Sequence, residues 1–198
     1  MKNTSKIYGL VLSGGKSTRM GEDKGEIKYH GIPQREHLYQ LLSKICDKTF
    51  ISIRDEQKGL VPESMNCIVD LNEHRGPYNG ILSAHKTHPN VAWLVLACDV
   101  PLLDLNALKQ LVSGRIANKV ATAFATKESE LPEPLVAIWE PQGLQQSIVH
   151  LQNGTSSCPR KFLINSDIAL LYPENDDVLI NANSKEEYEQ VVLKLAAV

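Results

Sequence analysis

The chain has 198 residues, of which 42% are hydrophobic, and this length is enough to bury a core without disulfides or metals. Its 21 Lys and Arg residues against 23 Asp and Glu residues give a net charge of -2, which argues against nucleic acid or an anionic membrane surface as a partner. The longest apolar run, residues 91–98, is far shorter than the roughly 20 residues of a membrane-spanning helix. Residues 7–12 are also too short for the apolar core of a secretory signal. We therefore predict a cytoplasmic protein whose phosphate-binding charge, if any, is local.

The cysteines and the even composition predict one domain without covalent staples. Four cysteines are spread through the chain, with no CxxC pair and no histidine at zinc-ligand spacing, so we expect reduced, partly buried thiols at Cys46, Cys67, Cys98 and Cys158. No internal repeat or low-complexity segment divides the chain. The expected organisation is a single domain over residues 1–198.

Short apolar segments bounded by turn residues predict the strands. They are rich in valine and isoleucine and do not alternate cleanly between apolar and polar residues, which is typical of strands covered on both faces. In chain order they are residues 6–12, 49–53, 67–70, 91–97 and 120–125. Continuous apolar strands of this kind favour a parallel sheet between two layers of helices.

Helical patterns lie between and after these strands. An apolar stripe predicts a helix over 37–45, and a second helix over 105–112 follows Asp104, a favourable N-cap. Ser184 and Glu187 form a capping box before a final amphipathic helix. Alternating strands and helices predict an α/β fold, a three-layer Rossmann-like domain with a mostly parallel sheet, whose ligands bind at the carboxyl ends of strands.

The segment after the first strand, residues 12–24, carries the strongest local signal for phosphate binding. It holds three glycines, two lysines and one arginine, and a backbone without Cβ atoms can approach a phosphate closely. Gly15 and Lys16 resemble the end of a Walker A loop, but that motif needs glycine where Leu10 stands. From composition alone, a glycine-rich surface turn with solvated charges remains the alternative.

Residues 14–24 resemble the GGxSxRMGxDK signature of the nucleotidyltransferases that attach a nucleotide to molybdopterin. Four further segments resemble family motifs in the same order: 75–81 is similar to GPLxGI, 97–103 to CDxPxL, 133–135 to xPL and 179–183 to the NxN segment. The resemblance covers nearly the whole chain and implies a fold of the nucleotide-diphospho-sugar transferase type.

The same resemblance implies roles for individual residues. It assigns catalysis to Arg19, Lys24 and Asp99, with Mg²⁺ bound by Asp99, and acceptor binding to Asn181 and Asn183. It assigns nucleotide binding to a larger set: Leu12, Ser13, Gly14, Gly15, Lys24, Asp70, Gly80 and Asp99.

Each of the polar assignments has a simpler structural alternative. Asp99, which ends the most apolar strand, is also compatible with a loop or helix-capping aspartate, and Asp70 with a turn. Asn181 and Asn183 alternate along an extended segment, so we expect only one of them to face the site, and a plain asparagine turn is the alternative.

The implied reaction is transfer of GMP from GTP to the terminal phosphate of molybdopterin with release of pyrophosphate. Glycine at position 14, where cytidylyl relatives tend to carry alanine, favours the guanylyl members. The partners implied are GTP and molybdopterin, with transient contacts to proteins that insert or accept the cofactor. The alternatives are the same chemistry with CTP, another small phosphorylated acceptor, or a nucleotide-binding regulator without turnover.

Some residues depart from the family pattern or suggest unrelated sites. Tyr78 and Asn79 replace an apolar-small pair, and Arg54 lies near a position where relatives often carry asparagine. His85 and His88 have the spacing of a metal pair but lack a third ligand, so we expect surface residues. Trp93, inside the most apolar strand, is expected in the core.

Overall fold

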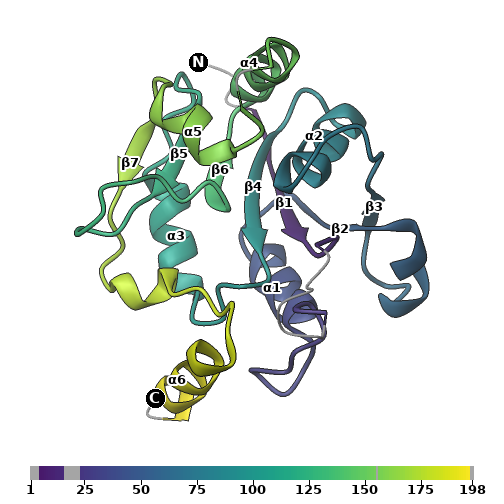
Figure 1. The fold of residues 1–198 in the computed structure, drawn as a ribbon, viewed down its shortest axis with the longest axis vertical. Coiled ribbons are helices and arrows are strands. Elements are labelled where there is room, and N and C mark those ends of the chain that lie inside the picture. Colours follow the sequence, from purple (N-terminus) through teal and green to yellow (C-terminus); the bar gives the residue numbers. More distant parts are fainter. Residues whose placement is uncertain (1–4, 16–22, 155, 197–198) are drawn as a thin grey trace.

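A computed structural model of the chain describes residues 5–15, 23–154 and 156–196. The strands of these residues form one sheet in the order β3-β2-β1-β4-β6-β5-β7 (Figure 1). In chain order they are β1 (Ile7–Leu12), β2 (Lys48–Ile53), β3 (Cys67–Val69), β4 (Ala92–Ala97), β5 (Ala121–Phe124), β6 (Val136–Trp139) and β7 (Ala169–Leu171). The α-helices are α1 (Gln34–Ser43), α2 (Pro77–Thr87), α3 (Leu105–Ser113), α4 (Pro141–Gln152), α5 (Pro159–Ile164) and α6 (Lys185–Ala196). Two 3₁₀ helices are η1 (Asp55–Leu60) and η2 (Asp176–Leu179).

The sheet is mostly parallel, as the apolar strands predicted. β1 pairs in parallel with β2 and β4, β2 with β3, and β5 with β7. β6 is the exception, because it runs antiparallel to both β4 and β5. Neither β6 nor β7 was among the strands predicted from apolar runs.

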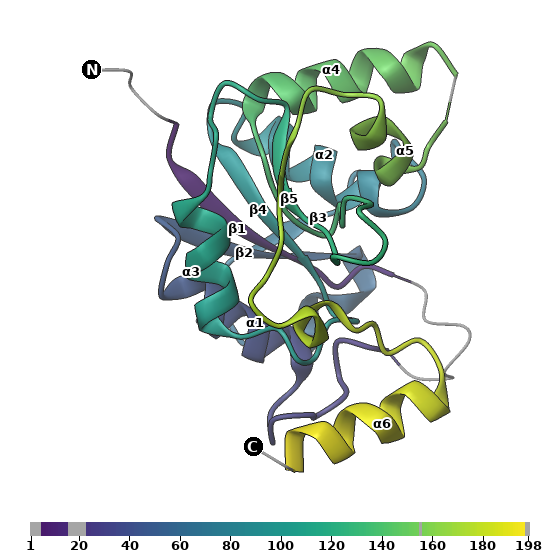
Figure 2. The same cartoon turned by 90° about the vertical axis from the view of Figure 1, so that its left-hand side faces the viewer.

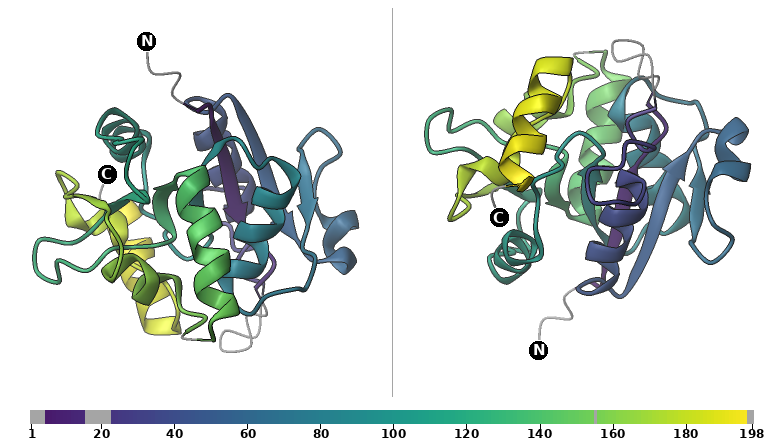
Figure 3. Two further views of the ribbon diagram at one scale, coloured as in Figure 1. Left: turned by 90° about the horizontal axis from the view of Figure 1, so that it is seen from above. Right: turned by 90° about the horizontal axis from the view of Figure 1, so that it is seen from below.

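Helices cover both faces of the sheet and make the three expected layers (Figure 2). On one face α1 and α3 pack their leucines against the strands, and on the other face α2, α4 and α5 do the same. The views from above and below show the sheet between these two layers, with α6 lying apart from it (Figure 3). The fully buried β4 stands at the centre, so its carboxyl end opens where both halves of the sheet meet.

The two predicted helix starts are confirmed by their caps. The Asp104 carboxylate accepts a hydrogen bond of 2.8 Å from the Ala107 amide at the start of α3. Before α6, the Glu187 carboxylate accepts from the Ser184 amide at 3.0 Å, and the Ser184 hydroxyl accepts from the Glu187 amide at 3.2 Å. The helix expected over 37–45 begins three residues earlier, at Gln34, and ends at Ser43.

Three side-chain expectations have different outcomes. Trp93 is fully buried, as predicted. His85 is buried in α2 instead of lying on the surface, and burial lowers its pKa, so the expectation for this histidine is wrong. All four cysteines are free, but Cys67 and Cys158 are exposed and not partly buried.

Within the described part of the chain, every helix is too short or too polar to cross a membrane.

Candidate active site

A cavity of about 460 Å³ opens at the carboxyl ends of the central strands, where the fold class predicts ligand binding. The loop after β1 forms one wall, and the start of α2 forms another. All eight residues predicted to bind the nucleotide line it: Leu12, Ser13, Gly14, Gly15, Lys24, Asp70, Gly80 and Asp99. The structure thus brings these eight predicted residues together at one cavity. Arg19, the remaining predicted catalytic residue, lies outside the described residues.

Two glycines allow backbone and carboxylate to approach one another in this cavity. A Cβ on Gly14 would lie 2.4 Å from Oδ2 of Asp70, and a Cβ on Gly80 would lie 2.3 Å from the Ser52 hydroxyl. Any other residue at either position would require the side chain of Asp70 or of Ser52 to shift. Glycine at position 14 therefore has a structural reason that does not depend on the size of the base.

Asp70 is a buried carboxylate at the end of β3. Its Oδ1 accepts a hydrogen bond of 2.6 Å from the Ser52 hydroxyl, and its amide donates to the Ile53 carbonyl. Burial raises the pKa of this carboxyl, while the Ser52 hydrogen bond and the Arg54 charge oppose the rise. A buried anion with a raised pKa in a cavity is a common feature of functional sites.

We predict that Asp70→Asn changes stability in a pH-dependent way. Because burial raises the pKa of Asp70 above the ordinary 3.8, ionisation of this carboxyl costs folding free energy at higher pH. The cost is absent well below pH 3.8, grows between pH 3.8 and the raised pKa of the folded state, and is constant above it. Thermal unfolding followed by circular dichroism should give the variant a higher Tm than the parent near neutral pH and a similar Tm in acid.

The exposed Asp55 supplies the matched control for this measurement. Its carboxylate pairs with Lys58 on the surface of η1. The Tm of Asp55→Asn should therefore not rise relative to that of the parent as the pH increases. An Asp70→Asn variant that is less stable than the parent, or whose difference from it does not change with pH, would contradict the expectation.

Lys24, Asp99 and Asn183 meet although they come from distant parts of the chain. The Lys24 ammonium donates to the Asn183 side-chain oxygen at 2.5 Å and lies 3.7 Å from Asp99 Oδ2. The Asp99 carbonyl accepts from the Ala182 amide at 2.8 Å, which fixes the asparagine segment beside the end of β4. The side chains of Lys24 and Asp99 are 21% and 25% exposed, so both are accessible from the cavity.

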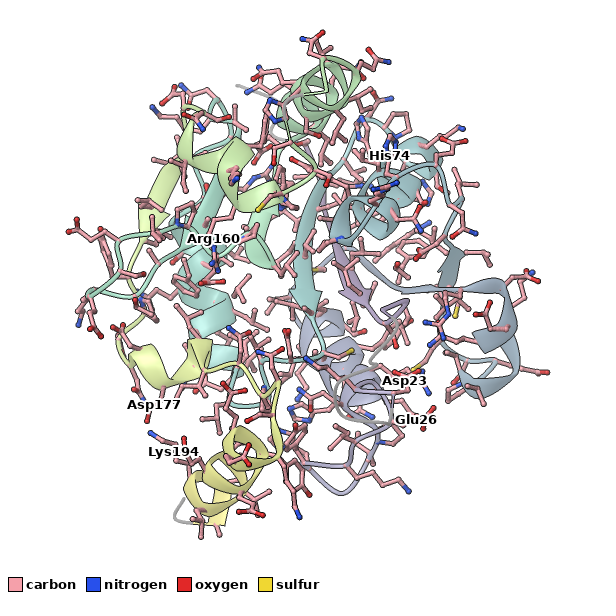
Figure 4. All side chains as sticks on the ribbon, viewed as in Figure 1. Asp23, Glu26, His74, Arg160, Asp177 and Lys194 are labelled. Atoms are coloured by element: carbon pink, nitrogen blue, oxygen red, sulfur yellow. The ribbon has the colours of Figure 1, made fainter. Side chains whose placement is uncertain are left out.

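A second cavity of about 180 Å³ adjoins the first and shares Asp99 with it. Both Asn181 and Asn183 line this second cavity, so the expectation that only one of them faces the site is wrong. Arg160 of α5 lines it too, with both Glu133 oxygens within 2.7 Å of its Nη2. Figure 4 places Arg160 on one side of β4 and His74 of the larger cavity on the other.

Arg160 is a site residue that the sequence reasoning missed. It lies in no glycine-rich or acidic motif, and its only local signal is a cation directly after Pro159, at the start of α5. It stands 27 residues from Glu133 along the chain, and only the fold brings the two together.

The carboxylate of Asp99 offers oxygen ligands to a divalent metal ion in the cavity. Among the residues that the structure describes, no group of three or more His, Cys, Asp or Glu side chains is close enough to hold a metal. Mg²⁺ is commonly held by one or two carboxylates, with waters and substrate phosphates completing its shell. Asp99, which borders both cavities, supplies such a carboxylate.

The residues that depart from the family pattern have clear structural partners. Arg54 Nη1 donates to the carbonyls of Gly14 and Gly15 at 2.8 and 3.0 Å, and so supports the loop from below. Tyr78 is fully buried and packs its ring against Trp139, which makes it an apolar residue in effect. Asn79 lines the larger cavity.

Comparison with known proteins identifies the family. Residues 9–169 match the model of the MobA-like NTP transferase domain. The chain belongs to this family. A molybdenum cofactor guanylyltransferase from Pseudomonas fluorescens is 31% identical over 180 residues, which cover 89% of each chain. Membership makes the chain a nucleotidyltransferase, and nucleotidyltransferases of the family generally use a divalent metal ion.

Two further relatives of this MobA-like chain bear on its extent and fold. A molybdenum cofactor biosynthesis bifunctional protein from Synechocystis sp. is 38% identical over 186 residues, 93% of this chain but 53% of that protein. The chain therefore spans about half the length of that relative. The molybdopterin-guanine dinucleotide biosynthesis protein A of Archaeoglobus fulgidus superposes with a TM-score of 0.78 at 21% identity, covering 96% of this chain and all of the other. That match supports the nucleotide-diphospho-sugar transferase type of fold.

Proposed function

We propose that this nucleotidyltransferase transfers GMP from GTP to the terminal phosphate of molybdopterin, forms the guanine dinucleotide cofactor and releases pyrophosphate. The observation that carries the proposal is the pair of adjoining cavities that share Asp99. The larger cavity is lined by both ends of the segment 12–24, called the glycine loop below. The smaller cavity is lined by an arginine and two asparagines. The names of the relatives, a molybdenum cofactor guanylyltransferase among them, support this choice of substrates.

In this proposal the nucleotide occupies the larger cavity. The backbone of Leu12, Ser13 and Gly14 lines the base and sugar, because amide and carbonyl groups at a strand end can reach a ligand closely where no Cβ intervenes. Lys24 faces the phosphates as a point charge. Arg19, although outside the described residues, supplies a second cation from the same loop.

The acceptor occupies the smaller cavity. Asn181 and Asn183 offer amide donors and acceptors to it, and the guanidinium of Arg160 matches a phosphate through a planar fork of donors. In the structure that fork is held by Glu133, so an incoming phosphate exchanges one anionic partner of Arg160 for another. Transient contacts with proteins that deliver or receive the cofactor are a further part of the proposal.

The reaction needs positioning and charge neutralisation more than covalent help from the protein. An oxygen of the acceptor phosphate attacks the α-phosphorus of GTP, a new phosphorus–oxygen bond forms, and the bond to the bridging oxygen of the β-phosphate breaks. Pyrophosphate leaves with that electron pair. The attacking phosphate is already ionised, so no general base is required, and Lys24 neutralises charge on the reacting phosphates.

A magnesium ion at Asp99 supplies neutralisation of phosphate charge and orientation of the two substrates when it is bound. The carboxylate of Asp99 would hold this ion from the protein side. Lys24 lies 3.7 Å from the same carboxylate, so its ammonium occupies this corner of the site as well.

The proposal is tested by nucleotide competition followed by a pyrophosphate-release assay with molybdopterin. We expect GTP with Mg²⁺ to support release and CTP to fail. Release with CTP and not with GTP would make the chain a cytidylyltransferase. Tight GTP binding without release for molybdopterin or for sugar and polyol phosphates would favour a regulator that has lost turnover.

A further inference from the structure

Gln57 connects the two ends of the glycine loop, although it lies outside every motif of the sequence. It belongs to η1, in the connection between β2 and β3, and its side chain is buried. Its Nε2 donates to the Ser13 carbonyl at 3.0 Å and to the Asp23 carboxylate at 2.7 Å. Ser13 directly follows β1 and Asp23 directly precedes Lys24, so one amide bridges the beginning and the end of the loop.

The hydrogen-bonding pattern at this position admits glutamine and not glutamate. Oε1 of Gln57 accepts a hydrogen bond of 2.8 Å from the Arg54 amide, while Nε2 serves two acceptors. A carboxylate offers acceptors only, so glutamate here would face the Ser13 carbonyl and the Asp23 carboxylate without a donor. A buried polar group left without its partner destabilises the folded state. The amide is therefore matched to these three partners.

The Asp23 carboxylate also contacts Gly25 and Arg35. Its Oδ1 accepts from the Gly25 amide at 2.9 Å, and its Oδ2 lies 3.7 Å from Nη1 of Arg35. The guanidinium of Arg35 is fully buried, donates to the Ser13 hydroxyl at 3.3 Å and pairs with Glu26. Figure 4 shows Asp23 and Glu26 close together beside α1, which carries Arg35.

We propose that Gln57 is a positioning residue that acts through Asp23 to hold Lys24 toward Asp99 before substrate binds. Asp23 and Lys24 are adjacent, so tethering the carboxylate of the first restricts the backbone from which the second extends. The Gln57 amide donates to Ser13 and Asp23 and not to Asp99 or Asn183, which are partners of the Lys24 ammonium, so its effect passes through the loop. This inference rests on the role proposed for Lys24 in transfer.

The test compares Gln57→Met with Gln110→Met. Methionine keeps the length of the side chain and removes both the donor and the acceptor. Gln110 makes the same kind of bond, from Nε2 to the Tyr172 carbonyl at 2.8 Å, but lies in α3 away from both cavities. We expect Gln57→Met to lower kcat about tenfold with a smaller change in the KM for GTP, and Gln110→Met to leave both within about twofold.

A double-mutant cycle with Lys24→Ala separates positioning from general damage. If Gln57 acts through Lys24, its substitution lowers kcat much less when Lys24 is already alanine, to about twofold or less. An equal loss in both backgrounds would overturn the proposal. An unchanged kcat for Gln57→Met in the parent background would overturn it as well.

Hydrogen exchange supplies a readout that does not depend on the reaction. The Gly25 amide is bonded to the Asp23 carboxylate, so its exchange should accelerate by about tenfold or more in Gln57→Met and stay unchanged in Gln110→Met. Unchanged exchange at Gly25 would overturn the tether. If the parent enzyme releases no pyrophosphate with GTP and molybdopterin, the proposed function fails while this measurement still decides the tether. Should Gln57→Met fail to fold, Gln57→Leu removes the same two donated bonds, leaves Asp23 intact and is expected to accelerate the same amide.

Discussion

Asp99→Asn is expected to lower the rate of pyrophosphate release by about 10³-fold while the protein stays folded. Asparagine has nearly the shape of aspartate but loses the charge that attracts a divalent cation. The backbone carbonyl that holds the asparagine segment through the Ala182 amide is unaffected. The rate measured over a range of Mg²⁺ concentrations should show weakened dependence on the metal as well as the lower maximum.

Asp104→Asn is the matched control for this substitution. It makes the same chemical change five residues further on, at the N-cap of α3, where the side chain only accepts a bond from the Ala107 amide. Asparagine caps helices about as well as aspartate, so this variant should retain both activity and Tm. Near-normal activity of Asp99→Asn would remove Asp99 from the metal site and from the mechanism.

Lys24→Ala is expected to reduce kcat by at least tenfold, on the order of 1.4 kcal/mol of transition-state stabilisation. The ammonium lies between Asp99 and Asn183 where the two cavities meet, so its charge falls where phosphate charge must be neutralised. Steady-state pyrophosphate release with GTP and molybdopterin measures the loss, and GTP titration separates weaker binding from slower transfer.

Lys28→Ala controls for the simple removal of a positive charge near the loop. Lys28 is exposed, lies four residues further along the chain and is not part of either cavity. We expect it to leave kcat unchanged. If Lys24→Ala also leaves kcat unchanged, Lys24 is a surface cation without a role in transfer. Gln57 would then have no catalytic side chain to position.

The local parts of the site were predictable because their signals are local. Leu12 ends an apolar strand and Ser13 and Gly14 follow it, while Asp99 closes the most apolar strand, so chain order alone places them at strand ends. The caps at Asp104 and Ser184 depend on side chains within three residues of the helix, and both are confirmed. The resemblance to the family added the remaining nucleotide-site residues.

The connections across the site could not be predicted in this way. Gln57 and Arg160 carry no motif, and the acidic side chains that they contact lie 34 and 27 residues away along the chain. His85 was expected on the surface because no third metal ligand accompanies it, but that reasoning does not show which face of α2 turns toward the sheet, and His85 is buried. Such residues become visible only when their partners are known.

What the sequence by itself determined is the kind of those elements that carry a recognised apolar run or cap, and the chemistry of the loop, since apolar periodicity, caps and glycines act over a few residues. The tertiary structure alone decided which elements meet. The apolar residues of β6 do not indicate the direction in which the strand runs. Only its pairing with β4 and β5 makes it antiparallel. The same packing places Arg160 in the cavity that Asp99 also lines, and brings the Gln57 amide to the Ser13 carbonyl. Contact with a partner distant along the chain depends on the assembled sheet and not on any one segment.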